Sequence, residues 1–210
     1  MSHDPLDYPF WLASRSAGVV AYLLLSGSVL LGLVMAARLA PVKARSDLRL
    51  LHERIALLAL GAVGAHGLLL LPDSWLRPGL HELVIPFSAS YRPVWTGLGI
   101  CAAYLAAGLS VTYYARRRLG ARRWRNAHRL IPIAWALAAV HVIGSGSDAV
   151  SLWLQVVLAI TIAAVVVLLA QRWWLGRLAP PAPPPSEPPP PAKEPQPAER
   201  RYAGELGLFR

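Results

Sequence analysis

The chain has 210 residues, of which 55% are hydrophobic and 15% are charged. Because soluble domains carry about 25% charged residues, this composition indicates a protein with several membrane spans and a lipid bilayer as its surroundings. The formal net charge is +10, but the arginines stand in short loops between apolar segments, so we interpret them as membrane-topology signals and expect no nucleic-acid partner.

Five apolar segments are predicted to form membrane-spanning helices. Their expected ranges are 16–37, 50–71, 94–115, 126–143 and 150–170. The first is long enough to cross about 30 Å of hydrocarbon at about 1.5 Å per residue. The fourth is the weakest, because its uninterrupted apolar run is short and Pro132 lies inside it. The expected fold is therefore an all-α integral membrane bundle of about five helices.

The basic residues predict an orientation for these spans. Most of them stand in alternate loops: Arg38, Lys43, Arg45 and Arg49, then Arg116, Arg117, Arg118, Arg122, Arg123 and Arg125, and finally Arg172 and Arg177. The loop 72–92 holds only Arg77 and Arg92. Because Lys and Arg are enriched in cytoplasmic loops, we expect the N-terminus outside and the C-terminus in the cytoplasm.

Three regions are expected along the chain. Residues 1–15 form an outer N-terminal segment that lacks the basic start and cleavage site of a signal peptide, so the first span is expected to be retained. Residues 16–175 form the bundle. Residues 176–210 form a cytoplasmic tail that is rich in Pro and Ala over 179–198, a composition that predicts disorder. The tail is either a plain disordered segment or a docking site for a partner.

Four histidines stand in the apolar part of the chain as two pairs. His52 and His66 are 14 positions apart, and His128 and His141 are 13 positions apart. The second and fourth segments cross the bilayer in the same direction, so each membrane face receives one histidine from each segment. Ionisable side chains in spans mark functional sites, and two facing neutral imidazoles supply both axial ligands of a haem iron. The pairs therefore predict two haems. Covalent c-type attachment is excluded, since the chain has no C-x-x-C-H.

Helix geometry agrees with one pair better than with the other. At about 100° per residue, 14 steps fall about 40° short of four turns, so His52 and His66 share a helix face. Thirteen steps fall about 140° short, so His128 and His141 do not share one on an ideal helix. A kink at Pro132 or a rotation between the two haem planes would reconcile the second spacing, and the sequence leaves both open.

Three arginines are candidates for binding haem propionates, because guanidinium matches carboxylate geometry. Arg54 and Arg129 flank the inner pair, and Arg92 stands at the outer mouth with few other basic residues. For the first two, the alternative is an ordinary loop arginine that obeys the positive-inside rule. For each histidine, the alternative is a buried, hydrogen-bonded side chain or an interface residue.

With these residues in place, the chain resembles the ferric reductase-like transmembrane domain family, which includes ferric reductases, NADPH oxidases and the haem membrane subunit of bacterial methionine sulfoxide reductase systems. In the family's oxidases, one helix carries H-x13-H and the helix two spans later carries H-x12-H. His52-x13-His66 and His128-x12-His141 match both spacings. Residues 11–18, 87–99 and 141–148 also resemble bacterial members, and the likeness covers residues 10 to 175.

Two features depart from the family pattern. Many members have six spans, whereas five are predicted here. Ferric reductases and oxidases continue into a flavin- and nicotinamide-binding domain, but only about 35 residues of Pro-rich tail follow the last span, too few for such a domain. The resemblance thus implies the electron-transfer subunit of an oxidoreductase without its own flavin or NAD domain, which should not oxidise NADH or NADPH alone.

The sequence as a whole leads to one expectation and two alternatives. We expect a membrane b-type cytochrome of the bacterial plasma membrane, which carries electrons through two bis-histidine haems of the b type from a cytoplasmic flavoprotein or a quinone. One alternative is a non-redox membrane scaffold or small transporter with a partner-docking tail. The other is a metal carrier that uses the histidines as hopping sites, although the intramembrane carboxylates expected for it are missing.

Overall fold

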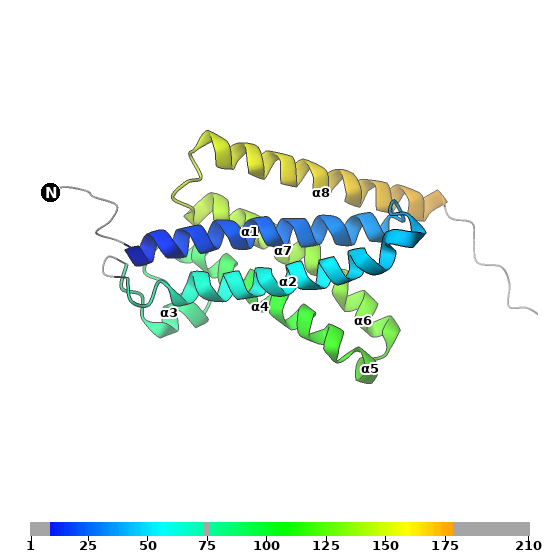
Figure 1. Ribbon diagram of the computed structural model, residues 1–210. Coiled ribbons are helices and arrows are strands. Elements are labelled where there is room, and N and C mark those ends of the chain that lie inside the picture. The colour runs from blue at the N-terminus through cyan, green and yellow to red at the C-terminus, as the bar shows by residue number, and fades with distance from the viewer. Residues whose placement is uncertain (1–8, 74–75, 179–210) are drawn as a thin grey trace, which may run out of the picture. The chain divides into compact units, whose positions relative to one another are not determined.

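The computed structural model describes residues 9–73 and 76–178, and all regular structure in this part of the chain is helical. The elements are α1 (Pro9–Ala36), the 3-10 turn η2 (Val42–Ala44), α2 (Arg45–Leu68), α3 (Leu80–Val84), α4 (Pro93–Tyr114), α5 (Arg116–Leu119), α6 (Ala121–His128), α7 (Ile131–Ser145) and α8 (Leu152–Leu178) (Figure 1). The helical unit is Met1–Arg177. The predicted disordered tail and most of the outer N-terminal segment lie outside the described residues.

Four helices in the described part of the chain are long and apolar enough to cross a membrane. They are α1, α4, the combined stretch Ala121–Ser145 and the α8 stretch Leu152–Arg177, with 28, 22, 25 and 26 residues. The remaining predicted span, 50–71, corresponds to α2, which has 24 residues. It is not among the four, because its first half carries Asp47, Glu53 and several arginines that lower its mean hydropathy.

The fourth predicted span is broken into two helices. Helix α6 ends at His128, Arg129 and Leu130 form a turn, and α7 begins at Ile131 with Pro132 in its first turn. Proline has no N–H for the helical ladder and its ring disturbs the preceding turn, so a helix restarts there more readily than it continues. The Leu130 N–H donates to the Ala127 carbonyl at 2.9 Å, and this hydrogen bond forms the tight turn between the two helices.

The long helices pack mainly in two pairs, α1 with α2 and α4 with α7, and contacts between α1 and α7 and between α2 and α4 join the pairs. Helix α8 adds to α1 and α7 through apolar side chains. Two clusters form this core: Tyr22, Ala139, Leu154 and Leu158, and Val29, Leu33, Trp135 and Val165. The Trp135 indole N–H donates to the Ser26 hydroxyl at 2.9 Å, so these two buried polar atoms are paired. Helix α2 is thereby held opposite α6 and α7.

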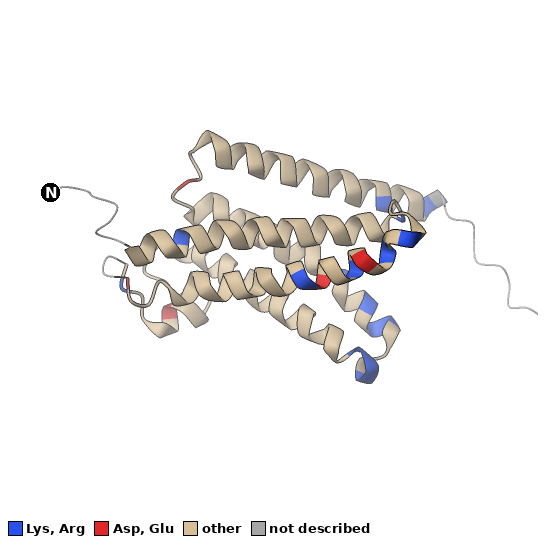
Figure 2. Cartoon of the chain, in the orientation of Figure 1, with Lys and Arg blue, Asp and Glu red and all other residues tan. Residues whose placement is uncertain are grey.

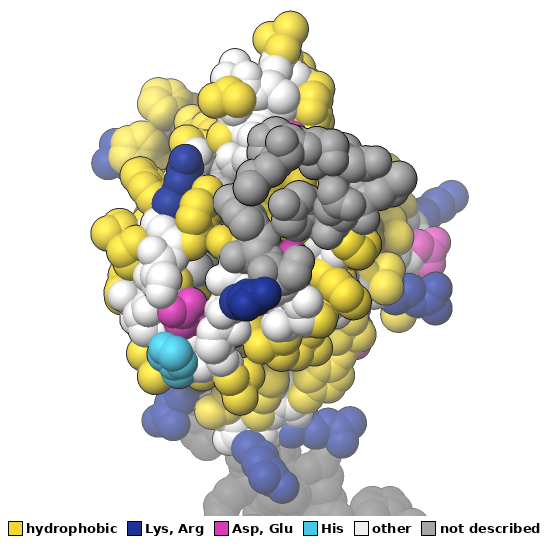
Figure 3. Space-filling model, turned by 90° about the vertical axis from the view of Figure 1, so that its left-hand side faces the viewer, with side chains coloured by type: hydrophobic (Ala, Val, Ile, Leu, Met, Phe, Trp, Pro, Cys, Tyr) yellow, Lys and Arg dark blue, Asp and Glu magenta, His cyan; other side chains and the backbone are white. Residues whose placement is uncertain are grey.

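Basic side chains gather at one end of the bundle, which we call the basic end. It comprises the turn between α1 and α2, helices α5 and α6, and the last turns of α8 (Figure 2). The opposite end presents many hydrophobic side chains with scattered charges (Figure 3). This asymmetry is the one that the positive-inside rule associates with a cytoplasmic face.

A reporter fused after Arg210 should therefore be active in the cytoplasm and silent in the periplasm. Helix α2 returns alongside α1, so the described residues pass along the bundle five times, and the start of α1 and the end of α8 lie at opposite ends of it (Figure 1). Paired fusions of alkaline phosphatase and green fluorescent protein measure this directly. Phosphatase activity without fluorescence would contradict the orientation and would mean that α2 does not cross.

Candidate functional site

The four predicted histidines meet as two facing pairs inside the bundle. His52 of α2 faces His128 of α6, with ring centroids 6.1 Å apart, and His66 of α2 faces His141 of α7 at 6.2 Å. We call them the inner pair and the outer pair, the inner one being nearer the basic end. The break between α6 and α7 is the feature that turns His128 and His141 toward the same neighbouring helix, although their spacing on one ideal helix would not.

Three of the four imidazoles are oriented by main-chain carbonyls of a neighbouring helix. The Nδ1–H of His52 donates to the Ser28 carbonyl at 2.9 Å, and that of His66 donates to the Ser14 carbonyl at 2.8 Å. The Nδ1–H of His141 donates to the Trp95 carbonyl at 2.9 Å. A carbonyl only accepts, so each bond sets the proton on Nδ1 and leaves the Nε2 lone pair free to bind a metal.

A glycine makes each of these bonds sterically possible. It stands four residues after the accepting carbonyl: Gly18 after Ser14, Gly32 after Ser28, and Gly99 after Trp95. A Cβ at Gly18 would lie 2.8 Å from His66 Nδ1, and one at Gly32 would lie 3.3 Å from His52 Cε1. A Cβ at Gly99 would meet the ring of His141 in the same way. The same carbonyl–glycine pair thus recurs three times.

His128 lacks this arrangement. In α1 the two carbonyl–glycine pairs are 14 residues apart, and the same step along α4 leads from Gly99 to Tyr113. A large ring stands there in place of a glycine, and Trp124 stacks on His128 with centroids 5.5 Å apart and planes at 28°. The Nδ1 of His128 and the Nε1 of Trp124 are both buried without a hydrogen-bond partner in the structure. The inner pair is therefore held asymmetrically.

A cavity of about 220 Å³, partly open to solvent, lies beside the inner pair. His52, His128 and Trp124 line it together with Arg125, Arg129 and Arg172. Of the two inner arginines predicted as propionate ligands, Arg129 is at this cavity. Arg54 is exposed and is not among the lining residues. Arg125 and Arg172 were missed because each stands in a basic cluster that the positive-inside rule already explains.

Arg92, predicted at the outer mouth, joins two helices. It precedes α4 in a left-handed conformation with φ of 44°, and its guanidinium donates to the Gly144 carbonyl near the end of α7. It also lies 5.4 Å above the ring of Tyr91. Helix α4 begins at the next residue, Pro93, so Arg92 stands three residues before Trp95, whose carbonyl orients His141. The structure thus gives Arg92 a positioning contact next to the outer pair.

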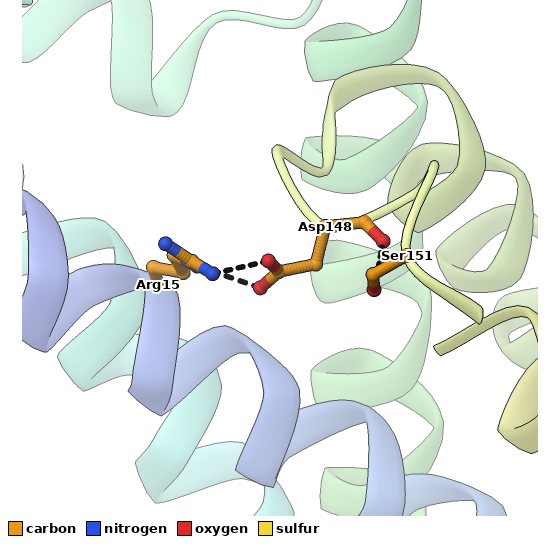
Figure 4. Close-up of polar contacts among 3 residues, drawn as sticks. All are labelled: Arg15, Asp148 and Ser151. Carbon is orange, nitrogen blue, oxygen red and sulfur yellow. Dashed lines mark hydrogen bonds and ion pairs between the residues drawn. The ribbon is translucent and has the colours of Figure 1, made fainter. Parts of the chain in front are cut away.

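An ion pair that sequence reasoning missed closes the same end of the bundle. Arg15 of α1 binds Asp148, in the turn between α7 and α8, through both carboxylate oxygens, with Nε donating to Oδ2 at 2.6 Å (Figure 4). Asp148 is largely buried, with 14% of its side chain exposed. The ion pair joins α1, next to Ser14, with the turn after α7. It therefore links the helix that orients His66 with the helix that carries His141. Arg15 and Asp148 lie in segments 11–18 and 141–148, which resemble bacterial members of the family, and this likeness was the signal available in the sequence.

The ligand set fits a metal held in a flat macrocycle. Because a metal–imidazole bond is about 2.0–2.1 Å long and the ring centre lies about 1.1 Å behind the nitrogen, two imidazoles on opposite sides of one metal have centres about 6.3 Å apart. Both observed distances are close to this value. No group of three or more His, Cys, Asp or Glu side chains that would hold a bare metal ion occurs among the described residues. The histidine pairs would therefore suit a metal whose other ligands come from a macrocycle such as a porphyrin.

Comparison with known proteins adds nothing to this geometry, since no protein-family model, curated protein or solved structure matches the chain. In its described part, the structure by itself defines a helical protein with four helices long and apolar enough to cross a membrane and with two facing histidine pairs.

Proposed function

We propose that this protein is a membrane b-type cytochrome that carries electrons across the bacterial plasma membrane through two bis-histidine haems. It would serve as the membrane subunit of a reductase of the ferric reductase-like kind. The observation that supports this most is the pair of facing histidine pairs, at 6.1 and 6.2 Å, stacked along one bundle. Their separation along α2 is about 21 Å at 1.5 Å per residue, which places one pair near each membrane face.

Each residue has a defined part in this proposal. His52 and His128 ligate the inner iron, and His66 and His141 ligate the outer iron. Haem iron supplies a reversible one-electron change between the ferric and ferrous states. The carbonyls of Ser14, Ser28 and Trp95 fix the ring orientations and raise the basicity of three ligands. Arg129, with Arg125 and Arg172, offers donors for haem carboxylates at the inner cavity. Electrons enter from a cytoplasmic flavoprotein or a quinone.

A dithionite-reduced minus oxidised spectrum of the purified protein tests the proposal. A bis-histidine cytochrome gives sharp α and Soret bands, and a pyridine haemochrome assay should return two haems of the b type per chain. Without haem, the proposal would fail, and a membrane scaffold with a docking tail would be the better reading. Metal analysis that found zinc or copper without porphyrin would favour the metal carrier.

A second test uses the orientation of the axial rings. The imidazole planes cross at 88° in the inner pair and at 73° in the outer pair. Nearly perpendicular axial ligands leave two iron d orbitals close in energy, so the oxidised protein should show strongly anisotropic low-spin signals in electron paramagnetic resonance. Rhombic signals of parallel imidazole planes at both sites would contradict this geometry, even if haem were present.

A further inference from the structure

A chain of aromatic rings leads from the surface of the basic end to the inner pair. Tyr114 ends α4 with 57% of its surface exposed, and its ring lies 5.2 Å from that of Tyr113. Tyr113 lies 5.9 Å from Trp124, which in turn stacks on His128 at 5.5 Å. No other ring-to-ring contact of the described residues reaches any of the four histidines from outside the pairs.

The chain of rings is fixed in place by polar contacts on both sides. The hydroxyls of Tyr113 and Tyr114 donate to the two carboxylate oxygens of Glu53, at 3.3 and 3.2 Å. Glu53 is the residue after His52, so the tyrosines are tied to the helix of the other inner ligand. The guanidinium of Arg116 lies over the ring of Tyr113, 4.0 Å from its centroid. Rings held in fixed positions favour electron tunnelling, because the electronic coupling between donor and acceptor falls steeply as the distance between neighbouring rings grows.

The surface around the exposed end is strongly cationic. Helices α5 and α6 carry Arg116, Arg117, Arg118, Arg122, Arg123 and Arg125 within ten residues, and the described part of these helices has no acidic side chain. Trp124 stands between Arg123 and Arg125, near the end of this run. A surface of one sign attracts a partner of the other sign and raises its association rate. The ring path therefore begins where an acidic protein would dock.

We propose that Tyr114, Tyr113 and Trp124 form the electron-input path to the inner pair, and that helices α5 and α6 are the docking surface for an acidic flavoprotein. This rests on the proposed function. His52 and His128 would hold the inner haem, whose iron would take up one electron from the reduced flavin of the docked donor, and the flavin would be oxidised by that one electron. The path explains why His128 is stacked on Trp124 where its three counterparts have a carbonyl–glycine pair.

Stopped-flow reduction of the intact haem-loaded protein tests the path, with reduced flavodoxin as the acidic protein donor and dithionite as the small donor. Trp124→Leu removes the central ring and should slow reduction by flavodoxin several-fold. Trp124→Phe keeps a ring and should restore most of the rate. The matched control is Trp173→Leu on α8, a tryptophan at the same end that stacks with Arg177 but contacts no histidine.

Three further readouts separate a path from a structural role. Haem content and the midpoint potential of the inner haem are measured in both variants, and each flavodoxin rate is divided by the dithionite rate of the same variant, so that a general change at the inner site cancels. A path predicts that this ratio falls in Trp124→Leu and recovers in Trp124→Phe, whereas a purely structural role lowers both rates together. The double variant Arg122→Glu and Arg123→Glu should slow reduction by flavodoxin by about tenfold at low salt and remove its salt dependence. Lys43→Glu with Arg49→Glu, an equal charge change at the same end, should have a much smaller effect.

The outcomes divide cleanly. Haem-free protein overturns the proposed function itself. A haem-loaded protein in which Trp124→Leu reduces as fast as wild type overturns the path alone. Equal effects of the two double charge variants would overturn the docking surface and would identify the arginines as topology signals or contacts for anionic lipid.

Discussion

Replacing His66 with Ala should halve the haem content of the purified protein and leave the inner haem in place. In the proposed function His66 is one of the two ligands of the outer haem, and His141, which faces it, would not hold a low-spin haem alone. The inner pair is formed by other residues: His52, 14 positions before His66, and His128, 13 positions before His141. A pyridine haemochrome assay with redox titration measures the change, in which one of two midpoint potentials should vanish.

The matched control for this experiment is His81→Ala. His81 lies in the short helix α3, outside the two pairs, so its loss should leave both haems bound. Unchanged haem content in His66→Ala would show that His66 is a structural histidine. Loss of both haems with a folded protein would show that the pairs do not bind independently.

Gly18→Ala should damage the outer site through a single methyl group. The new Cβ would lie 2.8 Å from His66 Nδ1, so the imidazole has to leave the Ser14 carbonyl or α1 has to move away from α2. Overpacking of this kind costs about 1–3 kcal/mol. We expect a weakened or lost outer haem, a shifted outer midpoint potential and a lower melting temperature.

Gly27→Ala supplies the control on the same helix. A Cβ at Gly27 meets nothing within 4 Å, so this substitution should be neutral or slightly stabilising, because Ala is the better helix former. Gly32→Ala should act on the inner haem in the way that Gly18→Ala acts on the outer one, but less strongly, since its closest contact is 3.3 Å. Equal behaviour of Gly18→Ala and Gly27→Ala would mean that the carbonyl–glycine pairs do not position the histidines.

Much of this arrangement could be predicted from local sequence. Apolar runs of sufficient length predict helices, and the structure confirms four of five as candidate spans. The level of each histidine along the bundle follows from its position in its segment, because a helix rises by a fixed amount per residue. The repeated Ser-x3-Gly in the first span, at 14–18 and 28–32, was a visible signal for the carbonyl–glycine pairs, but its meaning depends on which helix packs beside α1.

The sequence by itself determined which residue types meet and at what height, since composition and helical rise are local properties. The tertiary structure decided which way they face. His128 and His141 point away from each other on an ideal helix, yet in the structure, where the helix is broken at Arg129 and Leu130, each faces a histidine of α2. The Arg15–Asp148 ion pair and the stacking of Trp124 on His128 likewise depend on contacts between segments that are distant or separately folded. Rotation about a helix axis and the choice of neighbouring helix are set by packing of the whole bundle, which no single segment encodes.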